Sequence, residues 1–377
     1  MKARSAILHQ MGAKPPYKQS KPLKVEEIEL EGPGEGEVLV EVRASGLCHS
    51  DLSVINGNRP RPTPMALGHE SAGIVREVGV GVRNLSVGDH VVMVFVPSCG
   101  ECMPCVDARP ALCEPGAVAN GKGTLLSGNR RIKLNGEYVN HHIGVSAFSD
   151  YVVVSSRSLV RIEKDLPFDI AALFGCAVLT GVGAVINTAK ATPGSTVGVI
   201  GLGGIGLNSI LAADAIGATR IVAIDLLDDK LEFSKSLGAT DAYNAATDRL
   251  VERVKDETKG GLDFVMETAG SVKALELAYN ITKRGGTTVT AGLAHPSHNL
   301  SIQQVSLVAE ERTLKGSYIG SCVPKRDVPK YIELYKRGKL PVNKLMSGTI
   351  GFDQLNEAFD VLDSGHTMRQ VLLPHGK

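Results

Sequence analysis

The sequence predicts an α/β protein in which a doubly wound parallel sheet is inserted into a β-rich domain built from both ends of the chain. Short β-type runs separated by turns fill the first third, and strand and helix patterns alternate from about residue 178 onward. Such alternation forms a parallel sheet covered by helices. Helices at 328–337 and 352–362 close the chain. We expect 1–177 and 320–377 to form the first, β-rich domain and 178–319 the second, α/β domain.

Composition excludes several classes of function. The 377 residues, 43% of them hydrophobic, are too many for one ordinary core. With 41 Lys+Arg against 40 Asp+Glu, no surplus charge is available to neutralise nucleic-acid phosphates. Aromatic residues are only 4%, which disfavours base-stacking platforms and membrane-interface belts. The N-terminus turns polar too early for an export signal, so we expect a cytoplasmic protein with neither nucleic-acid nor membrane partners.

In the first domain, alternation of period two predicts strands at 37–43, 71–78 and 90–96. Residues 97–145 lack apolar periodicity, and so long a loop is expected to be functional or held by something other than a core. The uncharged stretch 170–189 approaches the length of a membrane span, but its glycines and polar residues favour a buried helix-and-turn region.

In the second domain, strands and helices alternate regularly. The predicted strands are 196–200, 220–224, 263–266 and 287–290, and the predicted helices are 204–216, 228–237 and 272–280. This order predicts strands buried on both faces by helices.

A glycine-rich turn follows the first of these strands. It reads G-x-G-x-x-G and consists of Gly201, Leu202, Gly203, Gly204, Ile205 and Gly206. Its glycines allow a tight turn, close approach of a pyrophosphate, and close packing of helix on strand. Asp225 closes the next strand, where its carboxylate accepts hydrogen bonds from ribose and repels a 2′-phosphate, with Lys230 nearby. This predicts NAD rather than NADP; the alternative is a structural turn in which Asp225 only caps the next helix.

Four closely spaced cysteines form a lobe at 97–115. They are Cys99, Cys102, Cys105 and Cys113. Four thiolates close a tetrahedron around zinc with no open position, which describes a structural site. Metal bonds would also replace the missing core of this loop. The alternative is unrelated thiols or disulfides, which a chain without an export signal disfavours.

A second metal site requires positions that are distant in sequence. Cys48 and His69 each follow a β-type run, and Cys176 begins the uncharged helix. Two cysteines and one histidine give a three-ligand zinc whose fourth position is open to water or substrate. Taken singly, each residue is better read as ordinary packing.

Together these motifs resemble the medium-chain, zinc-dependent alcohol dehydrogenases over essentially the whole chain. The segments that carry the resemblance are Cys48-His49-Ser50-Asp51, Gly68-His69-Glu70, the four-cysteine lobe, Cys176, and the glycine-rich turn with Asp225. The resemblance implies a Rossmann domain inserted into a GroES-like catalytic domain, with two zinc ions per chain. Segment 114–145 resembles the loop-containing branch of classes I and III, which implies a homodimer.

The resemblance also implies a mechanism. Zinc on Cys48, His69 and Cys176 binds an alcohol oxygen and lowers its pKa, Ser50 takes the hydroxyl proton, and hydride passes to NAD, reversibly giving an aldehyde or ketone. The remaining implied roles are Asp51 orienting His69, Glu70 behind the metal, His49 and Arg369 on the pyrophosphate, Thr180 beside the nicotinamide, and Phe95 in the substrate-pocket wall.

Two departures from the family pattern leave alternatives open. Ser53 stands where many relatives have a histidine that ends the proton relay, so the outer end of the relay is undefined. Residues 57–61 are Gly-Asn-Arg-Pro-Arg, where a glutathione-dependent branch carries acidic residues. This departure disfavours glutathione adducts as substrates. The nearest enzyme rival is a polyol or glutathione-adduct dehydrogenase on the same scaffold, and a non-catalytic NAD-sensing protein is the rival of another class. The sequence does not specify the alcohol. We expect His141 and His142 to lie in a solvated loop.

Overall fold

The computed structural model describes residues 1–376, which divide into two compact units. The first contains Met1–Cys176, Val323–Ile332 and the C-terminal segment from Asn343, and the second contains Ala177–Cys322 and Glu333–Val342. Both chain ends therefore contribute to the first unit. The expected boundaries at 177 and 320 lie within three residues of two of these divisions. The remaining difference is that the second unit also includes Glu333–Val342, because a further division passes through helix α12 (Pro324–Lys336).

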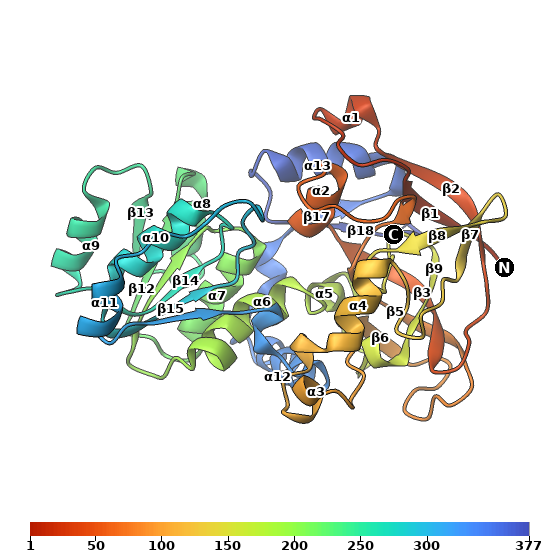
Figure 1. Ribbon diagram of the computed structural model, residues 1–377, viewed down its shortest axis with the longest axis horizontal. Helices are drawn as coiled ribbons and strands as arrows, with labels where there is room; N and C mark the ends of the chain where they lie inside the picture. The colour runs from red at the N-terminus through yellow and green to blue at the C-terminus, as the bar shows by residue number, and fades with distance from the viewer. Residues whose placement is uncertain (377) are drawn as a thin grey trace. The chain divides into compact units, whose positions relative to one another are not determined.

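The first unit contains a closed barrel and a larger sheet (Figure 1). The barrel has the order β1-β2-β7-β8-β4, and the sheet has the order β10-β6-β5-β3-β18-β17 with β9 paired to β3. These strands are β1 (Lys2–Leu8), β2 (Leu23–Leu30), β3 (Glu37–Gly46), β4 (Met65–Ala66), β5 (Glu70–Val78), β6 (His90–Met93), β7 (Ile132–Leu134), β8 (Glu137–His141), β9 (Tyr151–Ser155), β10 (Leu159–Ile162), β17 (Met346–Ile350) and β18 (Arg369–Leu372). The three strands predicted here correspond to β3, β5 and β6.

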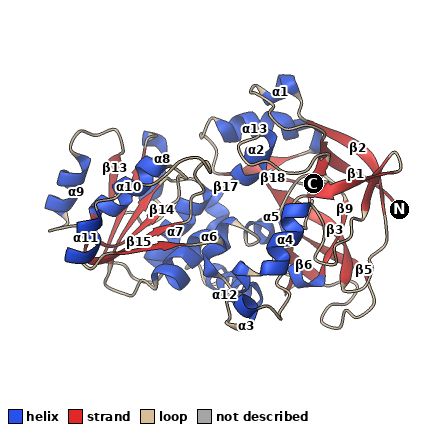
Figure 2. Cartoon of the chain, in the orientation of Figure 1, coloured by secondary structure: helices blue, strands red, loops and turns tan. Residues whose placement is uncertain are grey.

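Short helices connect the strands of the first unit (Figure 2). They are α1 (Tyr17–Ser20), α2 (His49–Ile55), α3 (Met103–Val106), η1 (Pro110–Leu112), α4 (Glu114–Lys122), η2 (Ser156–Ser158), α5 (Phe168–Leu173), η6 (Phe352–Gln354) and α13 (Leu355–Asp363). The turn η5 (Val342–Leu345) lies at the division between the units. The predicted closing helices correspond to α12 and to η6 with α13.

The prediction that residues 97–145 form a long loop is only partly right, because the segment contains the short helices α3, η1 and α4 and the strands β7 and β8. Strands β7 and β8 form a hairpin across Asn135 and Gly136, both of which have positive φ. Asn-Gly with two positive φ values is the preferred two-residue hairpin turn, because its twist matches that of the strands. The Asn135-Gly136 dipeptide could have predicted this hairpin, which a search for apolar periodicity does not detect.

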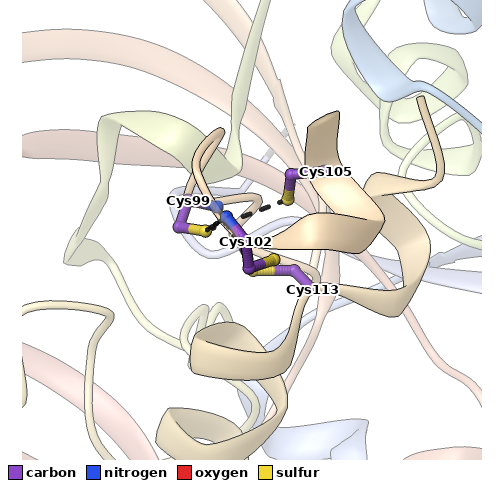
Figure 3. A group of neighbouring side chains, drawn as sticks. All are labelled: Cys99, Cys102, Cys105 and Cys113. Carbon is purple, nitrogen blue, oxygen red and sulfur yellow. Dashed lines mark hydrogen bonds between the residues drawn. The ribbon is translucent and has the colours of Figure 1, made fainter. Parts of the chain in front are cut away.

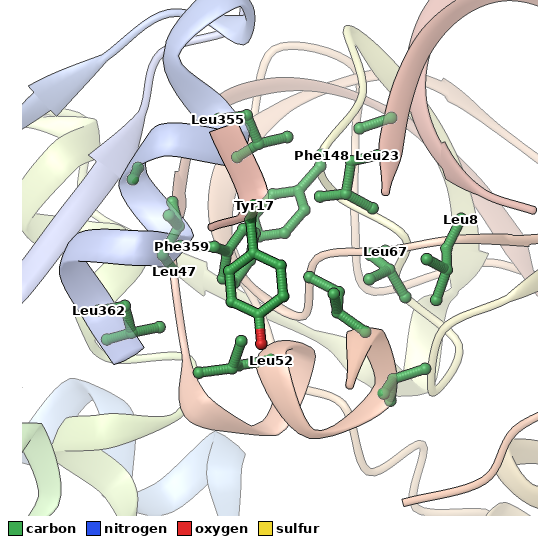
Figure 4. Packing of buried hydrophobic residues seen from close by; sticks show 14 of the residues in the cluster. Leu8, Tyr17, Leu23, Leu47, Leu52, Leu67, Phe148, Leu355, Phe359 and Leu362 are labelled. Atoms are coloured by element: carbon green, nitrogen blue, oxygen red, sulfur yellow. The ribbon is translucent and has the colours of Figure 1, made fainter. Parts of the chain in front are cut away.

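Residues from both chain ends share one core cluster in the first unit. Figure 4 shows Tyr17 packed near Leu355 and Phe359 of α13, with Phe148 beside them. The Phe148 and Phe359 ring centroids are 6.1 Å apart in an edge-to-face arrangement. This shared burial fixes the C-terminal helix α13 to elements from the start of the chain. The first unit is therefore completed only by the segment that follows the second unit in sequence.

The second unit is built on a six-stranded sheet with the order β13-β12-β11-β14-β15-β16, all pairs parallel. Its strands are β11 (Thr196–Ile200), β12 (Arg220–Asp225), β13 (Asp241–Asn244), β14 (Leu262–Glu267), β15 (Thr282–Thr290) and β16 (Thr313–Gly316). Counted from β11, this is the 3-2-1-4-5-6 order of the doubly wound dinucleotide fold, which confirms the predicted fold class. The order reverses between β11 and β14, where such folds bind ligands.

Helices flank this sheet (Figures 1 and 2). They are α6 (Ala177–Gly183), the π-helical turn η3 (Ala184–Ala189), α7 (Gly204–Ala215), α8 (Asp228–Lys235), α9 (Leu250–Glu257), α10 (Val272–Ile281), α11 (Gln304–Ala309) and η4 (Ile319–Ser321). The stretch 170–189 forms α5, α6 and η3 and is largely buried, as predicted. Within residues 1–376, no helix has both the length and the apolar character needed to cross a bilayer.

Candidate zinc and dinucleotide sites

Cys48, His69 and Cys176 converge in the first unit although they lie far apart in sequence. Cys48 follows β3 as the N-cap of α2, His69 lies between β4 and β5, and Cys176 follows α5. One ligand atom from each lies within 4.8 Å of the others, and all three residues are buried. Ligands on one tetrahedral zinc are roughly 3.8 Å apart. The spacing therefore fits a single ion with little movement.

Asp51 orients the ring of His69. The Nδ1 atom of His69 lies 3.0 Å from Asp51 Oδ1, and the Gly68 N–H donates to the same oxygen at 3.2 Å. With Nδ1 held in this way, Nε2 is left to face the two sulfurs, and it is buried without a hydrogen-bond partner. A buried imidazole nitrogen that lacks a partner beside two thiols fits a metal ion, and a carboxylate behind the ring is the usual support for such a ligand.

The two thiols of this site share their protons unequally. The pKa of Cys48 lies well below its ordinary value because Cys176 donates to it and His69 is close. The pKa of Cys176 is correspondingly raised by its hydrogen bond to Cys48 and by burial. Burial opposes the charged form of His69, but Asp51 outweighs it and raises the pKa of that ring. Without a metal, these pKa shifts favour the Cys48 thiolate beside protonated Cys176 and His69, so a bound cation would have to displace the protons of the latter two.

Glu70 and Arg369 form a buried pair beside the three ligands. Arg369 Nη1 lies 3.5 Å from Glu70 Oε2 and donates to the Leu47 carbonyl at 2.7 Å. Glu70 is not one of the clustered ligand residues. The guanidinium of Arg369 is buried among residues of the first unit. Its expected contact with the pyrophosphate is not tested by these contacts and stays a prediction.

Ser50 lies in the first turn of α2, and Phe95 lies beside the ligand His69. Phe95 packs edge-to-face on the His69 ring, with centroids 5.5 Å apart. Its carbonyl accepts a hydrogen bond from Asn120 Nδ2 at 2.8 Å, which ties α4 to this wall. His49 is exposed and Ser50 is half-buried in the first turn of α2. The hydroxyl of Ser53 donates to the His49 carbonyl, so it is engaged with its own helix.

The four cysteines of the predicted lobe face one another (Figure 3). Their sulfurs all lie within 4.8 Å of one another, and Cys99 Sγ and Cys105 Sγ are 3.9 Å apart. None of the four forms a disulfide. Burial disfavours the Cys99 thiolate, but N–H groups of Glu101 and Cys102 donate to it and lower its pKa to about 7. This arrangement fits a structural zinc site.

The glycine-rich turn of the second unit has the geometry that its sequence predicts. Gly201 has φ +88°, and a Cβ there would meet the Ala269 backbone, while a Cβ at Gly206 would collide with the Gly201 carbonyl. A Cβ at Gly203 would meet nothing within 4 Å. Packing therefore explains Gly201 and Gly206, whereas Gly203 leaves room before the N-terminus of α7. Its free N–H groups and positive dipole end fit a pyrophosphate.

Asp225 lies at the end of β12 and contacts this turn. Its carboxylate accepts hydrogen bonds from the Leu202 N–H at 2.6 Å and the Leu227 N–H at 3.1 Å. Asp225 is half-buried, and Lys230 on α8 is buried. Thr180 is buried on α6. The carboxylate is thus fixed at the carboxyl edge of the sheet, beside the glycine-rich turn.

The expectation that His141 and His142 lie in a solvated loop is wrong. Both are buried, and burial lowers the pKa of His141 to about 3, so its ring stays neutral. His141 accepts a hydrogen bond from the Arg131 N–H at 3.1 Å, whereas His142 lies against Asp51 and His69. No local sequence signal marks this burial, which follows from the pairing of β8 with β4.

Comparisons with known proteins agree with this geometry. Residues 34–164 match the alcohol dehydrogenase GroES-like domain, and residues 204–337 match the zinc-binding dehydrogenase domain. An alcohol dehydrogenase class-3 from Myxine glutinosa is 39% identical over 360 residues, which are 94% of this chain and 96% of that protein. A benzyl alcohol dehydrogenase from Acinetobacter calcoaceticus has a TM-score of 0.92 at 32% identity over 99% of both chains. A zinc-binding alcohol dehydrogenase domain protein from Burkholderia ambifaria has a TM-score of 0.94 at 31% identity over 100% of both.

Proposed function

Since this chain belongs to the medium-chain, zinc-dependent alcohol dehydrogenase family, we propose that Cys48, His69 and Cys176 hold its catalytic zinc. The enzyme is an alcohol dehydrogenase that reversibly converts alcohols into aldehydes or ketones with zinc and a nicotinamide cofactor. The observation that carries the residue assignment is the buried, partnerless Nε2 of His69 beside two thiols. A zinc ion held there supplies the Lewis acidity that lowers the pKa of an alcohol hydroxyl.

Residues of the first unit position the substrate and move its proton. Ser50, half-buried at the start of α2, takes the hydroxyl proton and passes it outward. Asp51 keeps His69 in the tautomer that leaves Nε2 free to coordinate. Phe95 covers the His69 ring and forms an apolar wall that excludes water. Glu70, buried beside Arg369, sets the charge behind the ligands.

The cofactor is proposed to be NAD, which accepts hydride from the alcohol carbon. The free N–H groups at the start of α7 bind the pyrophosphate where Gly203 leaves room. Asp225, held beside that turn, accepts from the ribose hydroxyls and repels a 2′-phosphate, with Lys230 adjacent. The pyrophosphate roles of His49 and Arg369 and the nicotinamide role of Thr180 rest on family resemblance alone.

A second, structural zinc is proposed on the four-cysteine lobe, so the full complement is two zinc ions per chain. The spacing of the four sulfurs supports it. None of the seven cysteines is in a disulfide, which supports a reducing compartment, and we propose the cytoplasm. A homodimer is supported by exposed apolar side chains on α11, which are Val305 and Val308.

Replacing Cys48 with alanine tests the assignment of the catalytic metal. We expect zinc content to fall from about two to about one per chain, because one thiolate ligand is lost from a three-ligand site. Alcohol oxidation should be abolished while NAD binding, measured by calorimetry, persists. Cys322→Ala is the matched control, since Cys322 is also buried but lies in neither cluster, and it should keep both zinc ions. Undiminished activity in Cys48→Ala would remove this site from the mechanism.

A further inference from the structure

The topology of the barrel places His142 beside the candidate catalytic zinc site. Strands β4 and β8 are parallel neighbours, with Ala66 paired to His141. Residues that follow two parallel neighbours emerge at the same edge of a sheet. His69 follows β4 by three residues, and His142 follows β8 directly. The hairpin that carries β8 thus brings a second imidazole to the ligand His69.

His142 contacts the same carboxylate oxygen that orients His69. Its Nδ1 atom lies 3.1 Å from Asp51 Oδ1, next to His69 Nδ1 at 3.0 Å. The His69 contact is a hydrogen bond, whereas the His142 contact is a close polar contact that leaves the buried Nδ1 without a hydrogen-bond partner. The two rings are perpendicular, with centroids 5.4 Å apart. Asp51 is fully buried, and its second oxygen has no hydrogen-bond partner. The position of Oδ1 therefore depends on the Gly68 N–H and the two imidazoles.

The loop after β8 is shaped to hold His142 in place. The His142 N–H donates to Ser146 Oγ at 3.0 Å and to the Ala66 carbonyl at 3.2 Å, and its carbonyl accepts from the Val145 N–H at 3.1 Å. Ser146 has a positive φ of 59°, so the tight turn includes a non-glycine residue in the left-handed region. These hydrogen bonds and the left-handed residue fix the backbone on both sides of the buried His142 ring.

We propose that His142 is a positioning residue for the catalytic zinc: its Nδ1, in polar contact with Oδ1 at 3.1 Å, restrains the Asp51 carboxylate, and Asp51 in turn holds the ligand His69. The proposal rests on the proposed metal site. A carboxylate that is free to rotate would leave the His69 tautomer and ring orientation less well fixed, which weakens the metal site. His142 acts through Asp51 and contacts neither substrate nor cofactor.

Three substitutions separate a donor role from simple packing. In His142→Asn the amide nitrogen takes the place of Nδ1, in His142→Gln it takes the place of Nε2, and in His142→Leu there is no donor. We expect His142→Leu and His142→Gln to lose the catalytic zinc at about tenfold lower chelator concentration than the wild type. His142→Asn should be close to the wild type. When cobalt replaces zinc, the visible absorption spectra of His142→Leu and His142→Gln should also differ from that of the wild type, because the spectrum reports ligand geometry.

Two controls make the outcomes distinguishable. His141→Leu removes the neighbouring buried imidazole, which contacts the Arg131 backbone rather than Asp51, and should leave zinc affinity unchanged. Cys48→Ala identifies which zinc is the catalytic one; if it loses none, the proposed metal site fails and this inference fails with it. Loss of one zinc in Cys48→Ala together with unchanged zinc retention in the His142 variants would overturn this inference alone. Equal zinc retention in His142→Asn, His142→Gln and His142→Leu, at any level, would overturn the role of Nδ1. If His142→Leu does not fold, the comparison of His142→Asn with His142→Gln still tests whether a donor at the Nδ1 position is required.

Discussion

Single side chains in this enzyme are fixed by what they contact rather than by their residue type. Asp225 illustrates this at the cofactor turn. Its two oxygens accept from the backbone N–H groups of Leu202 and Leu227, so the side chain is already oriented before any ribose is bound. A pre-oriented carboxylate spends little conformational entropy on binding and discriminates by its charge.

We therefore expect Asp225→Asn to relax the preference for NAD over NADP. The amide oxygen retains an acceptor for Leu202, but the negative charge that repels a 2′-phosphate is lost. The ratio of kcat/KM for NAD to that for NADP should fall by about tenfold, which corresponds to about 1.4 kcal/mol.

The matched control is Asp228→Asn on the exposed start of α8, which removes the same charge from a residue that contacts Asn244 instead of the turn. Its cofactor ratio should match the wild type. An unchanged ratio in Asp225→Asn would show that this carboxylate does not select the cofactor.

At the scale of elements, a half-buried acidic side chain links the two strands where the sheet order reverses. Asp263 on β14 accepts from the Thr196 N–H and hydroxyl of β11, each at 2.7 Å, and pairs with Lys283. Burial by itself raises the pKa of Asp263, but the Lys283 ion pair and the Thr196 hydrogen bonds outweigh it and lower that pKa. The charged form therefore stabilises the contact between β11 and β14.

This link makes stability depend on pH in a defined direction. Because the folded pKa is depressed, the stabilisation is present above the unfolded value of about 3.9 and is lost as pH falls through the folded pKa. Asp263→Asn should lower the free energy of unfolding by about 1–2 kcal/mol at pH 7. Urea denaturation should show the difference from the wild type shrinking as pH is lowered from about 5 toward 3.

Asp256→Asn, on the exposed face of α9, serves as the control and should change neither the stability at pH 7 nor its slope with pH. A constant difference between Asp263→Asn and the wild type across this range would contradict the assignment of the acid sensitivity to Asp263.

For the whole molecule, the exposed apolar side chains on α11 bear on assembly. Val308 is 66% exposed, and Val305 on the same helix is also exposed. A charge placed in a dimer interface there would be desolvated without a partner and would separate the subunits. We expect sedimentation velocity to show a dimer for the wild type and a monomer for Val308→Glu.

Val80→Glu provides the comparison, because Val80 is 79% exposed in a turn of the first unit. It should sediment as the wild type does. A dimer that persists in Val308→Glu would place the interface elsewhere.

Local chemistry made much of this protein predictable from its sequence. The glycine-rich turn, β11 and Asp225 lie within thirty residues of one another, and so do the four cysteines, so short-range spacing was sufficient to predict both sites. The parallel sheet followed from alternation because strands and helices of this length have few ways to pack. The β7–β8 hairpin was missed because its strands are short and its signal was a turn rather than a periodicity.

Long-range contacts decided the rest. Cys48, His69 and Cys176 were grouped only through family resemblance, since no local pattern relates them, and their convergence depends on how three separate elements pack. His142 shows the same limit more sharply. Its sequence neighbourhood is polar and glycine-containing, yet the parallel pairing of β4 with β8 buries it against Asp51. Sequence specifies which groups are available, whereas pairing between distant strands determines which of them meet.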